Sequence, residues 1–570
     1  MTYTPYDGSS YLDWDEVEAL LVAMSEAHAD LVSLTSVGES HQGRPIWMVT
    51  LCLGERELHE RSVLWLDAGT HASEWTGVSA LLYSLSRWVE GVASGDEELV
   101  QWFSERAILA IPCISPDGYD ALRQGAPYLR SSLRPPRHDE PRVGLDPCDM
   151  NGDGAVRWMR WRHPAGPLVQ DEEVPLFMRP RTLDDSPEDA FFVCSEGEFI
   201  GWDGVRWTGA QARYGVDLNR NFPANWKPFS MFGMDAGAYS ASEPESRAVL
   251  DAFASCTTIA AGLTYHTYTG CILTQPYQQD SPLDEDDLFV IQKLADDLVA
   301  ETGYDVYKVF PDFMYRADKP TPGVWSDTMT TVFGVPSYTV EFWNPYKAAG
   351  VEVKKPAEFF TSPDPKIIRE MIRFASEQPN ATPWTRFEHP QLGEVEIGGI
   401  DYMRTIRNPP EARLAEECAT GHRMAERLRR ALPDVHVSSS IERLGERLFA
   451  LNLQFENVGY LSTSALGRAA VVNASPGCKV SLDLPGDVTL SPSSPNRAVE
   501  VLPHLSGWGE RLQDGAQHAI YPSLGSSRSR HRATWLIEAD AGSAITCDIY
   551  LGRAGRQTLS VALDDERKPS

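Results

Sequence analysis

The chain of 570 residues is too long for a single hydrophobic core, and its 42% hydrophobic and 23% charged residues are typical of a folded protein rather than a disordered one. With 81 acidic against 51 basic side chains, the formal net charge is -30, so the surface repels nucleic acid and anionic membranes. We therefore expect neither as a partner.

The start of the chain and its cysteines indicate a reducing compartment. The first residues, MTYTPYDGSSYLDWDEVEALL, lack the basic stretch and apolar run of an export signal. The nine cysteines form no C-x-x-C pair, and because their number is odd, a complete disulfide framework is not expected. No apolar run of about 18 residues is present to span a membrane. We expect a cytoplasmic location.

Helices and strands alternate in the first two-thirds of the chain. Apolar residues at helical spacing predict a helix over 14–32, and the buried strand SVLWLDAG (62–69) precedes a helical stretch from about 74 to 92. Further buried strands are predicted at 107–114, 258–265 and 336–342. This alternation predicts an α/β domain with a mixed, mostly parallel sheet that is flanked by helices.

Two changes of pattern divide the chain. From about 125 to 214 the sequence is rich in Pro, Gly, Arg and Trp and too long for a plain connection, so we interpret it as an insertion. The turn-rich stretch PNATP near 378 predicts a linker. Beyond it, a helical segment precedes short β-like runs with turn signals between them. We therefore predict an α/β domain over 1–380 and a β-sandwich-like accessory domain over 381–570.

Metal-binding side chains stand at the ends of two predicted strands. LDAGTHASEW places His71 and Glu74 just past one buried strand, and GLTYHTYTG places His266 at the end of another. Ligands of open α/β sheets gather at the carboxyl ends of the strands. Two imidazoles and one carboxylate leave a fourth position for water, as in catalytic zinc sites. The pattern predicts one Zn²⁺ per chain, although the H-x-x-E pair alone is a weak signal.

A second candidate metal site lies in the insertion. In DPCDMNGDGAVRW, the residues Asp149, Asn151 and Asp153 alternate before Gly154, as in a calcium-binding loop. The distal glutamate of such a loop is missing. A plain turn is the favoured interpretation, and a structural Ca²⁺ is the alternative.

Five motifs, taken in order, resemble those of a known family. They are HASE (71–74), SPDGY (115–119), GVDLNRNFP (215–223), YHTY (265–268) and TVEFW (339–343). In this order they are similar to the motifs of the zinc carboxypeptidases, over about residues 10–375, and the rear region resembles a module that follows some bacterial members. The resemblance implies hydrolysis of a C-terminal peptide or isopeptide bond by metal-activated water, on substrates with a free C-terminal carboxylate.

The resemblance also implies roles for single residues. The two histidines and Glu74 would bind the zinc, and Glu341 would be the general base that takes a proton from water and passes it to the leaving amine. Asn219 and Arg220 would hold the terminal carboxylate of the substrate, for which a guanidinium fork is suited.

Two further roles are carried over on looser matches. A second arginine should stabilise the oxyanion, and among Arg157, Arg160 and Arg162 of VRWMRWRHP we predict Arg160. In the family this arginine lies closer to the Asn-Arg pair. The tyrosine that caps the substrate is predicted to be Tyr315, whose spacing to Glu341 departs from the usual pattern.

The substrate stays open at this point. The same site could hydrolyse the amide of a small acylamino acid or a cell-wall peptide, or the chain could be a non-catalytic binding or scaffold protein of the same fold. The pocket for the substrate side chain is expected near 315–327, where Asp318 and Asp327 could favour a basic residue. The insertion could cover the crevice and restrict access to it.

Overall fold

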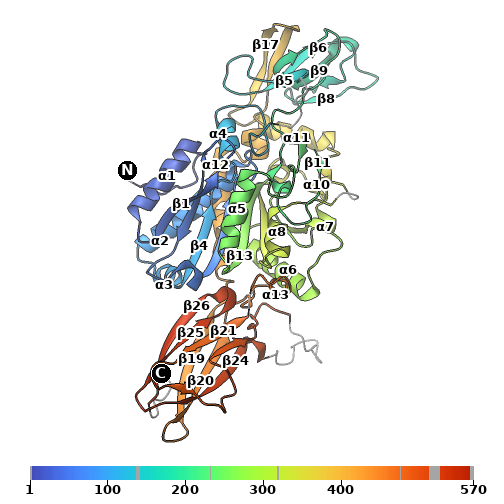
Figure 1. Ribbon diagram of the computed structural model, residues 1–570. Helices are drawn as coiled ribbons and strands as arrows, with labels where there is room; N and C mark the ends of the chain where they lie inside the picture. Colours follow the sequence, from blue (N-terminus) through green and yellow to red (C-terminus); the bar gives the residue numbers. More distant parts are fainter. Residues whose placement is uncertain are drawn as a thin grey trace.

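An eight-stranded sheet forms the centre of the computed structural model (Figure 1), which describes residues 3–135, 142–231, 233–316, 320–475, 477–511 and 527–564. In spatial order its strands are β1 (Val32–Glu39), β2 (Pro45–Leu51), β4 (Arg106–Ile111), β3 (Ser62–Ala68), β13 (Ile259–Thr267), β16 (Ser337–Phe342), β14 (Cys271–Thr274) and β15 (Asp305–Lys308). The four middle strands β4, β3, β13 and β16 are parallel, and β1 and β2 pair antiparallel with their neighbours. Strand β14 pairs antiparallel with β16 and parallel with β15. The predicted mixed sheet is confirmed.

Helices cover both faces of this sheet, and the strand sequences explain why. Every residue of β3 is buried, and alternate side chains enter different cores. Leu64 and Leu66 pack with helices α1 (Trp14–Ala27), α2 (Trp75–Ala93), α6 (Glu285–Val299) and α12 (Glu411–Arg429). Val63 and Trp65 pack with α5 (Pro244–Ser255) and α8 (Trp325–Thr331) on the other face. A strand that is apolar on both sides therefore belongs in the middle of the sheet.

The first helix is shorter than predicted. Helix α1 ends at Ala27, with a cap at His28, and β1 begins at Val32. The apolar residues Leu31 and Val32 continue the helical spacing, but the structure uses them to start an edge strand instead. The remaining helices of this part are α3 (Glu97–Glu105), α4 (Pro116–Arg123), α7 (Val309–Asp312), α9 (Pro345–Ala348), α10 (Pro356–Phe359) and α11 (Pro365–Ser376).

The insertion carries its own sheet. Residues that follow the predicted linker in the sequence complete this sheet. Its spatial order is β17 (Thr382–His389), β18 (Gly393–Gly399), β6 (Trp158–Arg162), β9 (Ala190–Ser195), β7 (Leu168–Gln170) and β8 (Met178–Pro180). Strands β5 (Gly144–Pro147) and β10 (Gly197–Ile200) form a separate pair. Figure 1 shows β17, β6 and β9 together at one end of the molecule.

The boundary between the two domains differs from the predicted one. Helix α12 packs on α2, and its Leu414 and Met424 belong to the same core as β3 and β13. The second core begins only at Val435. The stretch PNATP is a turn between α11 and β17 rather than a linker between domains. We therefore propose that the α/β domain extends to about residue 432.

The C-terminal module consists of two four-stranded sheets around one core. The first sheet contains β19 (Val435–Arg443), β20 (Leu448–Asn457), β24 (Arg530–Glu538) and β22 (Thr489–Leu490). The second contains β23 (Val499–Leu502), β21 (Cys478–Asp483), β25 (Ala544–Tyr550) and β26 (Arg556–Ala562). The buried guanidinium of Arg553 joins the module to the α/β domain, because it donates to the backbone carbonyls of Ile259 and Phe333.

Within the described ranges, the helices are all too short or too polar to cross a membrane. The cytoplasmic location stays a prediction.

The assignment of α12 to the α/β domain can be tested with a core substitution. Leu414→Ala should lower the free energy of unfolding of the α/β domain by about 2–5 kcal/mol, because it leaves a cavity beneath α2. The unfolding transition that it shifts should be the one that a zinc chelator also shifts, in thermal denaturation. Leu453→Ala, in the core of the C-terminal module, is the control and should shift the other transition. A shift of only the module's transition by Leu414→Ala would contradict the assignment.

Candidate metal centre and active site

Three buried side chains meet at the carboxyl ends of β3 and β13. His71 and Glu74 lie in the turn between β3 and α2, and His266 is the second-last residue of β13. The turn begins at Gly69, whose φ of +66° is accessible to glycine without strain and where a Cβ would meet Cys113 Sγ at 2.9 Å. The chain can therefore reverse directly after the strand and direct His71 and Glu74 toward β13.

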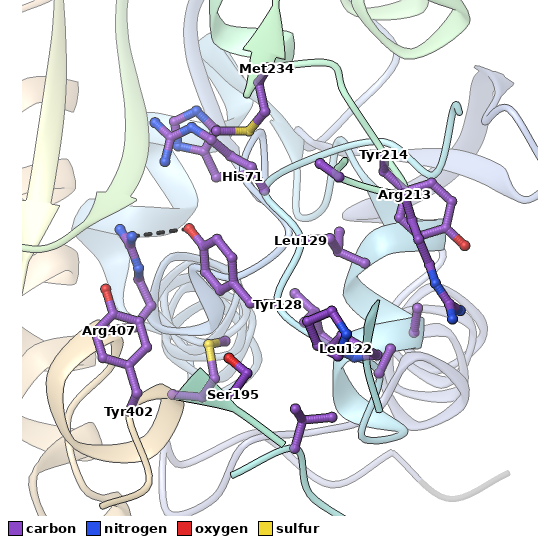
Figure 2. Close-up of a pocket in the computed structure, with 18 of the residues that line it drawn as sticks. His71, Leu122, Tyr128, Leu129, Ser195, Arg213, Tyr214, Met234, Tyr402 and Arg407 are labelled. Atoms are coloured by element: carbon purple, nitrogen blue, oxygen red, sulfur yellow. Dashed lines mark hydrogen bonds between the residues drawn. The ribbon is translucent and has the colours of Figure 1, made fainter. Parts of the chain in front are cut away.

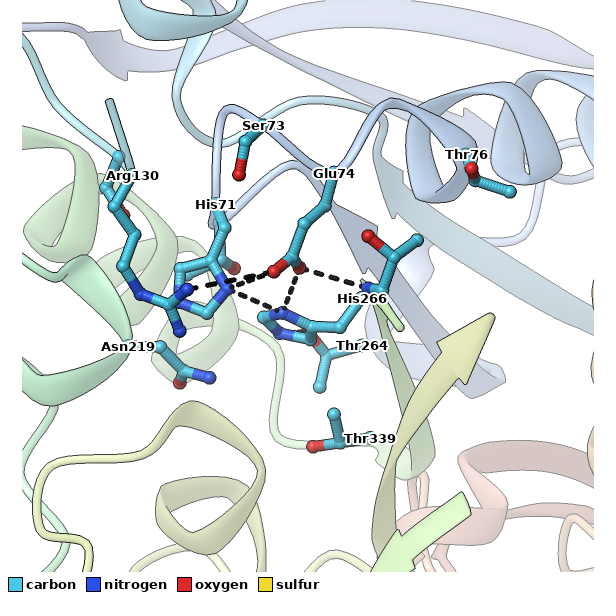
Figure 3. A network of polar contacts seen from close by, with 12 residues as sticks. His71, Ser73, Glu74, Thr76, Arg130, Asn219, Thr264, His266 and Thr339 are labelled. Atoms are coloured by element: carbon cyan, nitrogen blue, oxygen red, sulfur yellow. Dashed lines mark hydrogen bonds and ion pairs between the residues drawn. The ribbon is translucent and has the colours of Figure 1, made fainter. Parts of the chain in front are cut away.

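The three side chains are close enough to share one ion. His71 Nδ1 lies 2.9 Å from Glu74 Oε1, and His266 Nδ1 lies 2.8 Å from Glu74 Oε2 (Figure 3). The two Nδ1 atoms are 3.1 Å apart, and one ligand atom from each residue lies within 4.8 Å of the others. Burial by itself raises the pKa of Glu74, but the charges of His71 and His266 hold it well below its usual value.

This donor set fits a zinc ion. Two imidazole nitrogens that face each other at hydrogen-bond distance share at most one proton, and a cation between the three donors removes this conflict. Two nitrogens and one carboxylate oxygen are ligands that Zn²⁺ takes in catalytic sites, where a fourth position stays open. Of the residues that the structure describes, His71, Glu74 and His266 are the cluster that could hold a metal.

Asp217 orients the cluster from behind. Its Oδ1 lies 3.1 Å from His71 Nε2, and its Oδ2 accepts a hydrogen bond of 2.7 Å from Arg130 Nε. Burial raises the pKa of Asp217, but Arg130, Arg220 and His71 together hold it well below its usual range. A carboxylate on the outer nitrogen of a ligating histidine fixes the ring and its tautomer. His71 is therefore held with Nδ1 toward the other two ligands.

Glu341 occupies the position expected of a general base. It lies near the end of β16, directly opposite His266 in the parallel pairing of β13 and β16, and it lines the pocket. Burial, followed by the negative charge of Glu74, raises the pKa of Glu341 to about 7. A carboxyl group with this pKa accepts a proton near neutral pH and can release it again.

Asn219 and Arg220 follow Asp217 in a short 3-10 turn, η3 (Leu218–Arg220). Asn219 Oδ1 accepts a hydrogen bond from the backbone N–H of Trp325, which fixes the turn, and Figure 3 shows Asn219 near His71 and Arg130. Arg220 lines the pocket, and its Nη1 donates to the carbonyl of Asn219 at 2.6 Å. Arg220 therefore faces the predicted site, whereas Asn219 lies next to the metal cluster but outside the pocket lining.

The prediction for Arg160 is wrong, and Arg130 stands at the metal cluster instead. Arg160 lies in β6 of the insertion, pairs with Glu396 at 2.8 Å and stacks between Phe191 and Trp384, away from the pocket lining. Arg130 lines the pocket, with Nη1 4.0 Å from Glu74 Oε1. The insertion separates Arg130 from the Asn-Arg pair in the sequence. For this reason the motif spacing did not reveal Arg130.

Tyr315 lines the pocket as predicted, and burial raises the pKa of its hydroxyl. Of the two aspartates expected near the side-chain pocket, only Asp327 belongs to the described residues. Asp327 is buried outside the pocket lining and accepts hydrogen bonds from Gln275 Nε2 at 2.9 Å and Asn225 Nδ2 at 3.0 Å. Asp318 lies outside the described residues.

The calcium alternative is not supported. The Asp149 carboxylate accepts hydrogen bonds from the backbone N–H groups of Gly152 and Gly154, both at 2.8 Å. Asn151 Oδ1 accepts from the N–H of Asp153, whose carboxylate pairs with Arg157 at 2.6 Å. The loop satisfies its own oxygens as a turn, so no calcium site remains there.

The cluster opens into a pocket of about 1240 Å³. The insertion was expected at this crevice, whereas the contribution of segment 400–408 was not predicted. Insertion residues such as Arg142, Ser195 and Arg213 form one part of its wall (Figure 2). Tyr402 and Arg407, which also line the pocket, come from the segment after β18. Arg407 had no signal in the sequence, because it lies beyond the ordered motifs.

The fold and cluster together define a metal-dependent hydrolase site at the carboxyl edge of an α/β sheet. The sequence model of the zinc carboxypeptidase family matches residues 17–164 and 192–370, which is more than half of the chain. The chain therefore belongs to the zinc carboxypeptidase family. A second family model, described as a domain of unknown function, matches residues 435–562, which agrees with the start of the second core.

Curated relatives match only in part. Carboxypeptidase B of Astacus astacus is 32% identical over 113 residues, which are 20% of this chain and 35% of that protein. A zinc carboxypeptidase of Saccharothrix mutabilis subsp. capreolus is 28% identical over 156 residues, covering 27% of this chain and 34% of that protein. The chain thus matches about a third of the length of these relatives.

Solved structures show a weaker likeness. Thrombin activatable fibrinolysis inhibitor has a TM-score of 0.43 at 15% identity, over 75% of this chain and 76% of that one. Carboxypeptidase A of Helicoverpa armigera has a TM-score of 0.39 at 19% identity, over 66% of this chain and 77% of that one.

The orienting role of Asp217 can be tested through metal affinity. Asp217→Asn should weaken zinc binding about 10–100-fold, because His71 and Arg130 lose their common carboxylate. Competition with a coloured chelator measures the affinity. Asp251→Asn, on the exposed face of α5, is the control and should bind zinc like the wild type. Unchanged affinity in Asp217→Asn would contradict the role.

Proposed function

We propose that this protein is a metallocarboxypeptidase that hydrolyses the C-terminal peptide or isopeptide bond of its substrate. The observation that carries the proposal is that the buried cluster of His71, Glu74 and His266 shares one pocket with Glu341 and Arg220. A carboxypeptidase needs a metal cluster, a base and a guanidinium that faces the substrate, all within one pocket.

The two histidines and Glu74 would hold the zinc. When bound, Zn²⁺ supplies Lewis-acid chemistry, because it polarises a carbonyl group and makes a water molecule a better nucleophile. Asp217 keeps His71 in the orientation that this requires, and the two positive arginines Arg130 and Arg407 near Glu74 limit the repulsion between its charge and that of Glu341.

The chain's own residues then carry out the remaining steps. Arg220, with Asn219 beside it, binds the terminal carboxylate and so places the last peptide bond next to the cluster. Glu341 takes a proton from the attacking water and passes it to the leaving amine. Arg130 donates hydrogen bonds to the oxygen that becomes negative as the carbonyl is attacked. Tyr315 closes the pocket over the bound residue.

One observation favours short or flexible substrates. Residues of the insertion form part of the pocket wall, so a substrate must enter between the insertion and segment 400–408. Unfolded peptide tails meet this condition, and so do cell-wall peptides or acylamino acids, which are the alternative substrates. Folded proteins with short tails would be poor substrates.

Substitution of Glu341 tests the mechanism. Glu341→Gln should keep zinc near one per chain but lower the release of C-terminal amino acids from a peptide library by about 10²–10⁴-fold, because the amide cannot accept the proton. Metal analysis and amino-acid analysis measure the two quantities. The exposed Glu358→Gln is the matched control and should release amino acids at the wild-type rate. Zinc binding without any release by the wild type would overturn the proposal.

A second pair of variants tests which arginine stabilises the oxyanion. Arg130→Gln should lower kcat by about 10²–10³-fold, as expected for the loss of one oxyanion donor. Arg160→Gln should leave kcat unchanged but destabilise the sheet of the insertion, because Glu396 loses its partner. Steady-state kinetics and thermal denaturation separate the two effects. Equal kinetic losses in both variants would show that the assignment to Arg130 is wrong.

A further inference from the structure

The pocket is positively charged although the protein is strongly acidic. Its described lining residues include eight arginines against five carboxylates, whereas the whole chain has a net charge of -30. Some of the arginines are neutralised: Arg142 and Arg213 both pair with Asp146 at 2.7 Å, and Arg130 pairs with Asp217. The terminal carboxylate of a substrate would neutralise only one further arginine, Arg220. Positive charge remains in the pocket after that.

Arg407 lies outside the residues that match the family model, yet its guanidinium reaches the metal cluster. Its Nη1 lies 3.5 Å from Glu74 Oε1 and donates to the carbonyl of Thr267 at 3.2 Å, and its Nη2 donates to the Tyr128 hydroxyl at 3.1 Å. Figure 2 shows Arg407 and Tyr128 facing each other, with Tyr402 beside the arginine. Glu74 also contacts both histidines, so its charge does not belong to Arg407 alone.

The guanidinium of Arg407 is held rigidly. The rings of Tyr268, Tyr128 and Tyr402 surround it at 5.2–5.9 Å. The next residue, Asn408, is fully buried; its side chain donates to the carbonyl of Ser73 at 2.9 Å and accepts from the N–H of Thr76 at 3.1 Å. Segment 400–408 is therefore fixed to the turn that carries His71 and Glu74.

Arg404 adds a second cation from the same segment. Arg404 and Arg407 lie within one π-helical turn, η4 (Met403–Arg407), and both line the pocket. Arg404 lies over the ring of Trp75, the residue after Glu74, and its nearest carboxylate, Asp401, is 3.5 Å away. Asp401 offsets part of the charge of Arg404, and the two arginines of this turn lie along the same pocket wall.

Arg407 and Arg220 approach the cluster from different sides. Arg220 follows Asp217, which contacts His71, whereas Arg407 contacts Glu74 and the end of β13. In a bound substrate, the terminal carboxylate lies on Arg220 and the last peptide bond lies at the cluster. The rest of the substrate must then extend away from Arg220. The residue before the scissile bond then passes the side of the cluster where Arg407 stands.

From this arrangement we propose that Arg407, supported by Arg404, binds a carboxylate on the amino side of the scissile bond, so that the enzyme prefers peptides with an acidic penultimate residue. The proposal rests on the carboxypeptidase function proposed above. It concerns the residue before the scissile bond and is separate from the expected basic preference of the side-chain pocket, where Asp327 lies outside the pocket lining.

The experiment compares two peptides with the same C-terminal residue and either Glu or Gln as the penultimate residue. The wild type should cleave the Glu peptide with a kcat/KM about tenfold higher or more, the scale of one hydrogen bond between charged groups, and added salt should reduce the ratio. In Arg407→Gln the ratio should fall toward one, mainly through the KM of the Glu peptide, while Arg407→Lys should keep part of it. The exposed Arg430→Gln is the matched control and should keep the wild-type ratio.

The outcomes distinguish the acidic preference from the carboxypeptidase function on which it rests. Equal cleavage of both peptides by the wild type overturns the acidic preference alone. An equal loss of kcat/KM on both peptides in Arg407→Gln, with zinc retained, does the same. No cleavage of either peptide by the zinc-loaded wild type overturns the carboxypeptidase function as well. If Arg407→Gln does not fold, the wild-type ratio, its salt dependence and Arg407→Lys decide the question.

Discussion

The structure depends on one buried arrangement of charge: the Glu74 carboxylate between two imidazoles, at the point where β3 and β13 end. A buried carboxylate is costly unless cations or hydrogen bonds compensate it. His71 and His266 contact this carboxylate, a cation held by the three side chains would compensate it further, and the positive charges of Arg130 and Arg407 lie nearby. The parallel sheet matters because it brings these strand ends to one edge.

The same constraint explains the roles of the neighbouring groups. Asp217 can hold both His71 and Arg130 because each of its carboxylate oxygens serves one of them: Oδ1 faces His71 Nε2, and Oδ2 accepts from Arg130 Nε. Burial of Glu341, on the next strand, together with the negative charge of Glu74, raises its pKa to about 7. The buried pocket and the metal cluster therefore both affect the chemistry of the base, as neighbouring groups in active sites commonly do.

The active site also depends on parts of the chain that are distant in sequence. Strands β17 and β18 complete the sheet of the insertion, and the next residues, up to Asn408, return to the turn that carries Glu74. Helix α12 then covers α2. The insertion, segment 400–408 and α12 thus form one continuous structure with the zinc carboxypeptidase core, and the C-terminal module is joined to it at the other end, through Arg553.

By itself the sequence determined the fold class and the groups whose position follows from a strand end. His71, Glu74 and His266 could be predicted because a buried strand is recognisable by its apolar run and its carboxyl end lies at the sheet edge. Glu341 could be predicted only because it belongs to the ordered motifs that resemble the zinc carboxypeptidases. Only the tertiary structure decided which arginine reaches the site. Arg160 sits in a strand of the insertion, whereas Arg130 and Arg407 arrive through loops whose paths no local pattern encodes. The tertiary structure also decided the domain boundary, because the apolar face of α12 does not reveal which core it covers.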